Sequence, residues 1–101
     1  METTQIIKIC VDYSELLKNE FPPEKMPEDL GEFSPETKTA WLKHACYMAQ
    51  RIPEFLEDNR REKAMRWLGY LQGILNMSGV ITLREAKETN MPQGATYNRD
   101  A

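Results

Sequence analysis

The sequence predicts an all-α fold with a three-helix core, built on an antiparallel helical hairpin and followed by a short C-terminal helix. Apolar residues recur at helical spacing in three long stretches, and prolines, a glycine and capping residues mark the ends of those stretches. One β-branched run, residues 6–11, could instead begin a strand, but the chain contains no second strand pattern to pair with it. A chain of 101 residues is expected to form a single helical domain over 1–101.

Composition limits the classes of function. Hydrophobic residues make up 41% of the chain and charged residues 29%, as in an ordinary folded domain, and the formal net charge of -3 disfavours a general attraction to nucleic acid. The longest uncharged run, residues 67–83, is too short and too polar to span a membrane, so we expect no membrane association. Cys10 and Cys46 fall on predicted apolar faces. Without a secretory signal, they indicate reduced thiols in a cytoplasmic protein.

The first helix is expected over residues 4–20. Its apolar stripe comprises Ile6, Ile9, Cys10, Tyr13, Leu16 and Leu17. Phe21 and two prolines end it, because a residue before proline avoids the helical conformation. An acidic, proline-rich connection is expected over 21–34. Residues 20–36 contain six acidic residues, with Glu20 and Glu36 included, against one lysine, which indicates a solvated crossover or, alternatively, an acidic docking surface.

The second helix is expected over residues 35–57, with Ser34 as its N-cap and Pro35 at its first position. Its apolar stripe comprises Trp41, Ala45, Met48, Ile52 and Phe55. Pro53 lies inside this helix and removes one backbone hydrogen bond. We therefore expect a kink near residues 49–52, in preference to a second start of the helix.

The third helix is expected over residues 60–78. Asn59 and Glu62 fit a capping box at its start, and Gly79 fits the left-handed residue that ends a helix. Its apolar stripe comprises Ala64, Trp67, Leu68, Leu71, Ile74 and Leu75. Two matched stripes joined by a short link predict the antiparallel hairpin, with the first helix packed across it.

The C-terminal segment predicts one more helix and a tail. Thr82 and Glu85 have the spacing of a capping box and open a short helix over residues 83–89. Residues 90–101 lack periodicity and are expected to form an irregular tail.

Nothing in the sequence predicts catalysis, a cofactor or a metal site. His44 is the only histidine and is interpreted as a helix-edge residue, because no nearby spacing supplies the partners that catalysis or metal binding requires. The carboxylates fall on loops and outer helix faces, where a solvated role is expected. We expect a protein that is not an enzyme.

The most informative feature is a pair of glycines inside the third helix. Gly69 and Gly73 are one turn apart, opposite the apolar stripe, and each costs about 0.5 to 1 kcal/mol relative to alanine. Two such residues predict a shallow groove, flanked by Tyr70 and Met77 on one side and Met65 on the other. Either the first helix or the acidic connection fills this groove within the chain, or a partner or a second copy does.

The start of the third helix carries an unusual cluster of basic residues. Positive charges in the first turns oppose the helix dipole, so an anionic group is expected nearby. The acidic connection could supply that group within the chain. An acidic partner or nucleic acid is the alternative, with nucleic acid disfavoured because interleaved aromatic residues are absent. The candidate partner-binding residues on this helix are Arg60, Arg61, Lys63, Arg66, Gly69, Tyr70, Gln72, Gly73, Asn76 and Met77.

One resemblance covers residues 62–90. The run Arg66-Trp67-Leu68-Gly69-Tyr70-Leu71-Gln72-Gly73, followed by Gly79 and the Thr82-x-x-Glu85 helix start, resembles the C-terminal half of small uncharacterised accessory proteins of tailed bacteriophages. Asn76 and Ala86 depart from it, since large apolar groups are expected there. The resemblance implies a phage accessory protein made in the cytoplasm of a bacterial host, and it brings no catalytic residues with it.

These observations favour a non-enzymatic accessory protein that binds and modulates a host or phage protein. Two alternatives remain at this point. One is a structural homo-oligomer in which the same groove pairs copies of the chain. The other is a nucleic-acid or nucleotide-ligand binder that uses the basic start of the third helix.

Overall fold

The computed structural model describes residues 1–92, and most of the expected irregular tail, residues 93–101, lies outside the described part. The described residues form four α-helices and no strands. The helices are α1 (Thr3–Leu17), α2 (Lys38–Glu57), α3 (Arg61–Met77) and α4 (Leu83–Asn90). The all-α prediction is therefore confirmed, and the last helix extends one residue further than predicted.

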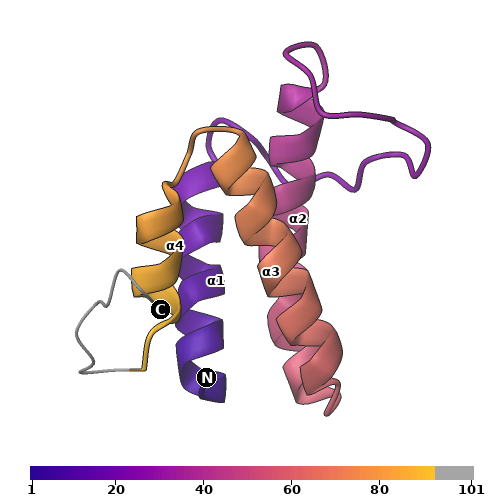
Figure 1. Ribbon diagram of the computed structural model, residues 1–101. Coiled ribbons are helices and arrows are strands. Elements are labelled where there is room, and N and C mark those ends of the chain that lie inside the picture. Colours follow the sequence, from indigo (N-terminus) through magenta and orange to yellow (C-terminus); the bar gives the residue numbers. More distant parts are fainter. Residues whose placement is uncertain (93–101) are drawn as a thin grey trace.

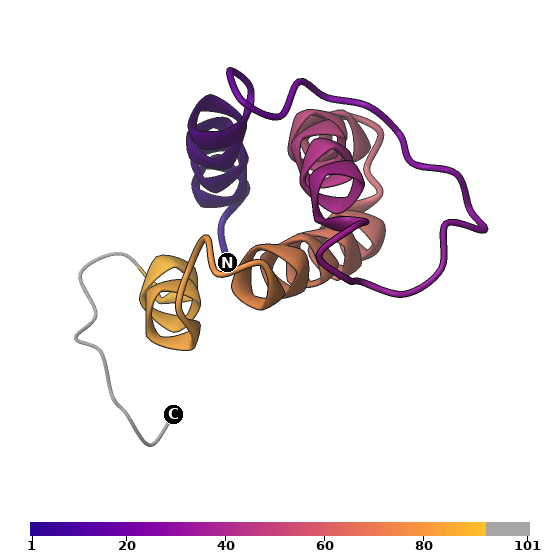
Figure 2. The ribbon, with the colours of Figure 1, turned by 90° about the horizontal axis from the view of Figure 1, so that it is seen from above.

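The three long helices form the core, with α2 packed closely against both α1 and α3 (Figure 1). Seen from above, α1, α2 and α3 enclose the core, and α4 lies beside α3 at the side away from α2 (Figure 2). The predicted stripes of α2 and α3 are buried, apart from Trp41 and Trp67, which are half-buried at the edge. Because α2 packs against two helices, it also buries Leu42 and Ala49, which the predicted stripe did not include, and Cys46, which was expected on an apolar face.

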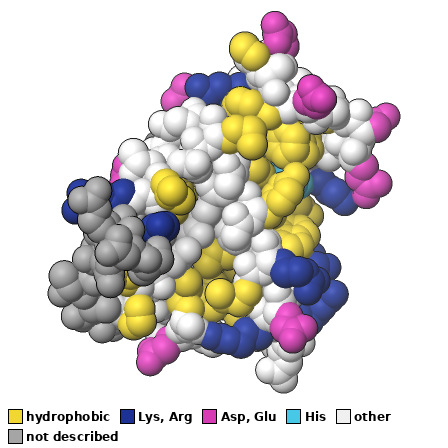
Figure 3. Space-filling model, in the orientation of Figure 1, with side chains coloured by type: hydrophobic (Ala, Val, Ile, Leu, Met, Phe, Trp, Pro, Cys, Tyr) yellow, Lys and Arg dark blue, Asp and Glu magenta, His cyan; other side chains and the backbone are white. Residues whose placement is uncertain are grey.

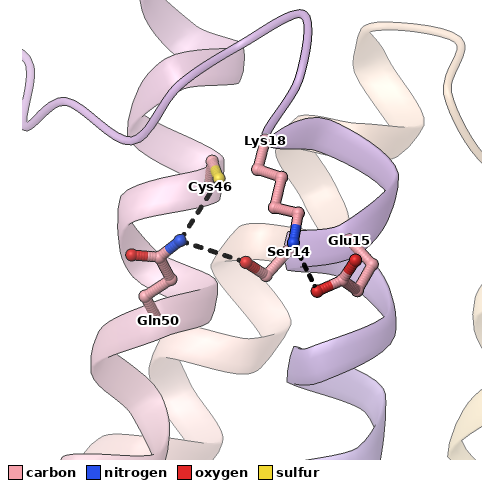
Figure 4. Close-up of polar contacts among 5 residues, drawn as sticks. All are labelled: Ser14, Glu15, Lys18, Cys46 and Gln50. Carbon is pink, nitrogen blue, oxygen red and sulfur yellow. Dashed lines mark hydrogen bonds and ion pairs between the residues drawn. The ribbon is translucent and has the colours of Figure 1, made fainter.

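The first helix buries the predicted stripe except for Leu16, whose side chain is 60% exposed. The last turns of α1 carry polar contacts (Figure 4). Gln50 Nε2 of α2 donates to Ser14 Oγ at 3.1 Å, and Lys18 pairs with Glu15, one turn earlier in the same segment, at 2.7 Å. The helix ends at Leu17, three residues before the predicted boundary, and residues 18–20 form a turn.

The start of α3 corrects one prediction. Asn59 does not cap α3: it adopts a left-handed conformation, with φ of 60°, and closes α2. The Asn59 N–H donates to the Leu56 carbonyl at 3.2 Å, and the Arg60 N–H donates to the Phe55 carbonyl at 2.8 Å. These two bonds make a Schellman ending, for which asparagine is the best substitute for glycine. Arg60 is therefore the N-cap of α3, with no side-chain hydrogen bond, and the predicted capping box with Glu62 is absent.

The end of α3 and the start of α4 confirm two predictions. Gly79 has φ of 78° and closes α3 by the same pattern, with its N–H donating to the Asn76 carbonyl at 3.1 Å. Thr82 and Glu85 form the complete capping box: the Glu85 N–H donates to Thr82 Oγ1 at 3.0 Å, and the Thr82 N–H donates to Glu85 Oε1 at 3.3 Å.

The start of α2 differs from the prediction by three residues. Ser34 does accept a hydrogen bond from the Thr37 N–H, at 3.3 Å, but this bond closes a separate turn over residues 35–37. The α-helix begins at Lys38, with Thr37 as its N-cap. Farther along, α2 continues through Pro53 to Glu57 without a second start. The kink at Pro53 remains a prediction.

Candidate functional site

The outer face of α3 carries an apolar groove of about 700 Å³, which we call the α3 groove. Its floor and rims come from the acidic connection, from the first turn of α2 and from α3. The lining residues are Gly31, Glu32, Phe33, Trp41, Gly69, Tyr70, Gly73, Ile74 and Met77. In Figure 3, hydrophobic side chains gather over this region, between acidic side chains of the connection at the upper right and a group of Lys and Arg side chains at the lower right.

The packing of the described residues does not require glycine at these two groove positions. Apart from the neighbouring backbone of α3 itself, a Cβ atom built on Gly69 or on Gly73 meets no heavy atom of residues 1–92 within 4 Å. Neither α1 nor the acidic connection therefore fills the space over these two residues. Beside them, Tyr70 is 54% exposed and Met77 is 65% exposed, which places large apolar surface in contact with water.

The acidic connection forms one wall of the groove because several contacts hold it against α2. The Met26 N–H donates to His44 Nδ1 at 3.4 Å, and the Glu24 N–H donates to the Lys43 carbonyl at 3.2 Å. Lys43 Nζ also lies 3.6 Å from a carboxylate oxygen of Glu24. Burial, and secondarily the charge of Lys25, lower the pKa of His44, so a neutral ring that accepts the Met26 hydrogen bond is favoured.

Aromatic contacts join the groove to the core of the hairpin. The rings of Trp41 and Tyr70 lie 6.4 Å apart, and the ring of Tyr47 lies 6.5 Å from that of Trp67. Sequence analysis assigned Trp41 only to the apolar stripe of the second helix. Its half-exposed side chain is in fact the part of α2 that lines the groove.

The predicted basic residues gather at the start of α3, away from the acidic connection. Lys63 Nζ lies 4.6 Å from the centre of the Phe55 ring, and the Arg60 guanidinium carbon lies 5.7 Å from it. Arg61 donates to Thr3 Oγ1 at 3.1 Å. Desolvation against the rings, together with the charges of Arg60, Arg66 and Arg51, lowers the pKa of Lys63.

No carboxylate of the described chain pairs with this basic group. The ion pairs within residues 1–92 do not include Arg60, Arg61, Lys63 or Arg66. The interpretation that the acidic connection neutralises the start of α3 within one chain is therefore wrong. The two groups lie along different parts of the helix, since the connection lines the groove with α3 residues from Gly69 to Met77, whereas the basic residues lie between Arg60 and Arg66.

Two predicted site residues have structural roles instead. Gln72 is 6% exposed and faces α1 and α4: it donates to Tyr13 Oη at 3.2 Å and exchanges hydrogen bonds with Asn90. Asn76 is exposed, and its side chain donates to the Ile81 carbonyl at 3.1 Å, which holds the link between α3 and α4. Neither residue lines the groove.

Sequence analysis did not identify Gly31, Glu32 or Ile74 as part of the site. Gly31 has φ of 93° and lies where the connection turns back towards α3. The sequence signal for this turn was available in the Leu30-Gly31-Glu32 run. The position of this turn against α3 depends on tertiary contacts, which a local sequence pattern cannot predict.

Within the part of the chain that the structure describes, no group of three or more His, Cys, Asp or Glu side chains could hold a metal ion. No helix among residues 1–92 is long and apolar enough to cross a membrane.

Comparisons with protein-family models, with curated proteins and with solved structures found no match to this chain.

Proposed function

We propose that the protein is a non-enzymatic interaction protein that binds and modulates another protein, and that the α3 groove receives a helix of that partner. The observation that carries the proposal is the glycine pair. Gly69 and Gly73 weaken α3 by about 0.5 to 1 kcal/mol each, and none of residues 1–92 uses the space that they leave. A foreign helix backbone that approaches closely is the simplest use of that space.

The chemistry of the groove supports a helical, amphipathic partner segment. Trp41, Tyr70 and Met77 offer apolar surface along one side of the two glycines, as in grooves that bind the apolar face of a helix. In the setting that the phage resemblance implies, the partner is a host or phage protein in the cytoplasm of an infected bacterium.

The test is affinity capture from infected bacteria with three tagged forms of the full chain. Gly73→Gln places a side chain in the groove and keeps a good helix former. Val11→Gln changes an exposed apolar residue of α1, outside the groove, and serves as the matched control. Circular dichroism confirms that all three forms are folded.

We expect one protein, different from the chain itself, to be retained by the wild type and by Val11→Gln and to be lost with Gly73→Gln. Its direct binding is then reproduced with the two purified proteins. The proposal is wrong if all three forms retain the same proteins, or if no different protein is retained by the wild type.

A further inference from the structure

We propose that a second copy of this chain occupies the α3 groove in the free protein, with the two α3 helices antiparallel about a two-fold axis. The inference rests on the proposed function in one respect, namely that the groove receives a helix. It adds that this helix is α3 of a second copy, which occupies the groove until a different partner binds.

Charge is distributed unevenly along α3 and the groove beside it. The basic residues Arg60, Arg61, Lys63 and Arg66 lie at the start of the helix, whereas Glu32 lines the groove together with α3 residues from Gly69 to Met77. Glu32 and the neighbouring acids Glu28, Asp29 and Glu36 form no ion pair with another described residue. Each chain therefore presents acidic side chains of the connection, with Glu32 in the groove wall itself, on one side of the apolar surface and the basic start of α3 on the other (Figure 3).

The spacing of residues along α3 fits a two-fold pairing of two copies. The centre of the glycine pair is at the level of Leu71, with Arg66 five residues before it and Met77 six residues after it. At a rise of 1.5 Å per residue, these distances are about 7.5 and 9 Å along the helix axis. A two-fold axis perpendicular to α3 at this level therefore brings Arg66 of one copy to the level of Met77 of the other, where it faces the groove whose wall includes Glu32.

The same symmetry places the glycines opposite each other. Gly69 of one copy then faces Gly73 of its partner copy, so that both backbones approach where neither chain has a side chain. Parallel pairing would instead bring the two basic groups together. Charge thus selects the antiparallel arrangement, and a face that is complementary to itself is what a two-fold dimer requires.

The dimer also bears on how a different partner could bind. The second copy and a partner helix would compete for one groove, so the dimer would hold the surface closed until a tighter partner displaces it. Exposed Tyr70 and Met77 are covered in either state.

The test uses the purified full chain alone, in sedimentation equilibrium over a range of concentrations. We expect a monomer–dimer equilibrium for the wild type and for Val11→Gln. Gly73→Gln is expected to remain monomeric while it retains its helical circular dichroism spectrum.

Charge reversal identifies the arrangement. Arg66→Glu alone creates two contacts between like charges in the symmetric dimer, and so does Glu32→Lys alone. Each variant should weaken association by about tenfold. A mixture of the two variants should restore association. In the heterodimer, one contact pairs the two substituted side chains, which have opposite charges, and the other contact pairs the native Arg66 with the native Glu32. A pair formed within one chain could not be restored by mixing.

The inference is overturned if the wild type is monomeric throughout, if Gly73→Gln dimerises as strongly as the wild type, or if mixing does not restore association. A monomeric wild type that still captures a different protein through the groove would leave the proposed function standing. A groove-dependent dimer that captures no different protein would support this inference and contradict the proposed function.

Discussion

Gln72 of α3 and Asn90 of α4 hold each other through two hydrogen bonds. Gln72 Nε2 donates to Asn90 Oδ1 at 2.7 Å, and Asn90 Nδ2 donates to Gln72 Oε1 at 2.8 Å. α4 itself contributes no buried residue, so this polar pair, together with the bonds from Gln5 to the Thr89 and Met91 carbonyls, helps to fix the helix against the core.

This pair predicts an unequal effect of single and double substitutions. Asn90→Leu leaves the buried amide of Gln72 with an unsatisfied acceptor and should lower the free energy of unfolding by about 1 to 3 kcal/mol. Changing both residues to leucine should cost less than the sum of the two single changes. Urea denaturation of the four forms in a double-mutant cycle measures this, and additive costs would show that the two amides act independently.

The glycines of α3 predict a gain of stability on substitution. Gly69→Ala and Gly73→Ala should each raise the free energy of unfolding by about 0.5 to 1 kcal/mol, because alanine favours the helix and the added Cβ meets nothing. The measurement is thermal unfolding at a concentration low enough to give monomers. Gly79→Ala is the contrasting control. It should destabilise by about 1 to 2 kcal/mol, since φ of 78° is strained for any residue with a Cβ.

His44 predicts a dependence of stability on pH. Burial and Lys25 lower its pKa below the ordinary 6.5, so the unfolded chain binds a proton more readily than the folded chain. The stabilising contribution is therefore present above pH 6.5 and is lost as the pH falls through 6.5 towards the folded pKa. We expect the free energy of unfolding to fall by less than about 1.4 kcal/mol per pH unit in this range.

The control for His44 is His44→Gln, which keeps an acceptor for the Met26 N–H but does not titrate. Urea denaturation at a series of pH values should show a flatter profile for this variant between about pH 7 and about pH 5.5. Identical profiles for the two forms would mean that His44 does not carry the effect.

The two thiols predict protection from modification. Cys10 and Cys46 are fully buried, and burial raises the pKa of Cys10 to about 12 and that of Cys46 above its ordinary value. Because the thiolate is the reactive form, neither residue should react with a thiol reagent at about pH 8 in the folded protein. Both should react after addition of guanidinium chloride. Rapid reaction of the native protein would show that the core opens frequently.

Local patterns predicted most of the fold. The apolar stripes of the hairpin, the ending at Gly79 and the capping box at Thr82 each depend on residues close together in sequence, and all three are confirmed. Asn59 was assigned to the wrong helix because asparagine suits both an N-cap and a left-handed ending. Only the hydrogen bonds to Phe55 and Leu56 distinguish the two roles.

The candidate site was harder to predict. Helical spacing placed Gly69, Gly73, Tyr70 and Met77 on one face, and the structure keeps them together. The same spacing put Gln72 beside them, but α4 covers that side of α3, and Gln72 is buried there. A helical wheel cannot show which side another helix covers, nor that the connection carrying Phe33 would return to form a wall.

The tight ending at Asn59 has a consequence for the order of folding. It joins α2 to α3 by a minimal turn, so the contacts of the hairpin are local in sequence, whereas α1 reaches α2 only after the connection over residues 18–37 has closed. Local contacts form faster, and closing a longer loop costs more entropy. The hairpin is therefore expected to form in the folding transition state before α1 docks. Leu68→Ala should therefore slow folding, whereas Ile6→Ala should mainly speed unfolding. Stopped-flow kinetics measures both rates. If Ile6→Ala slows folding and Leu68→Ala mainly speeds unfolding, α1 docks first and the prediction is wrong.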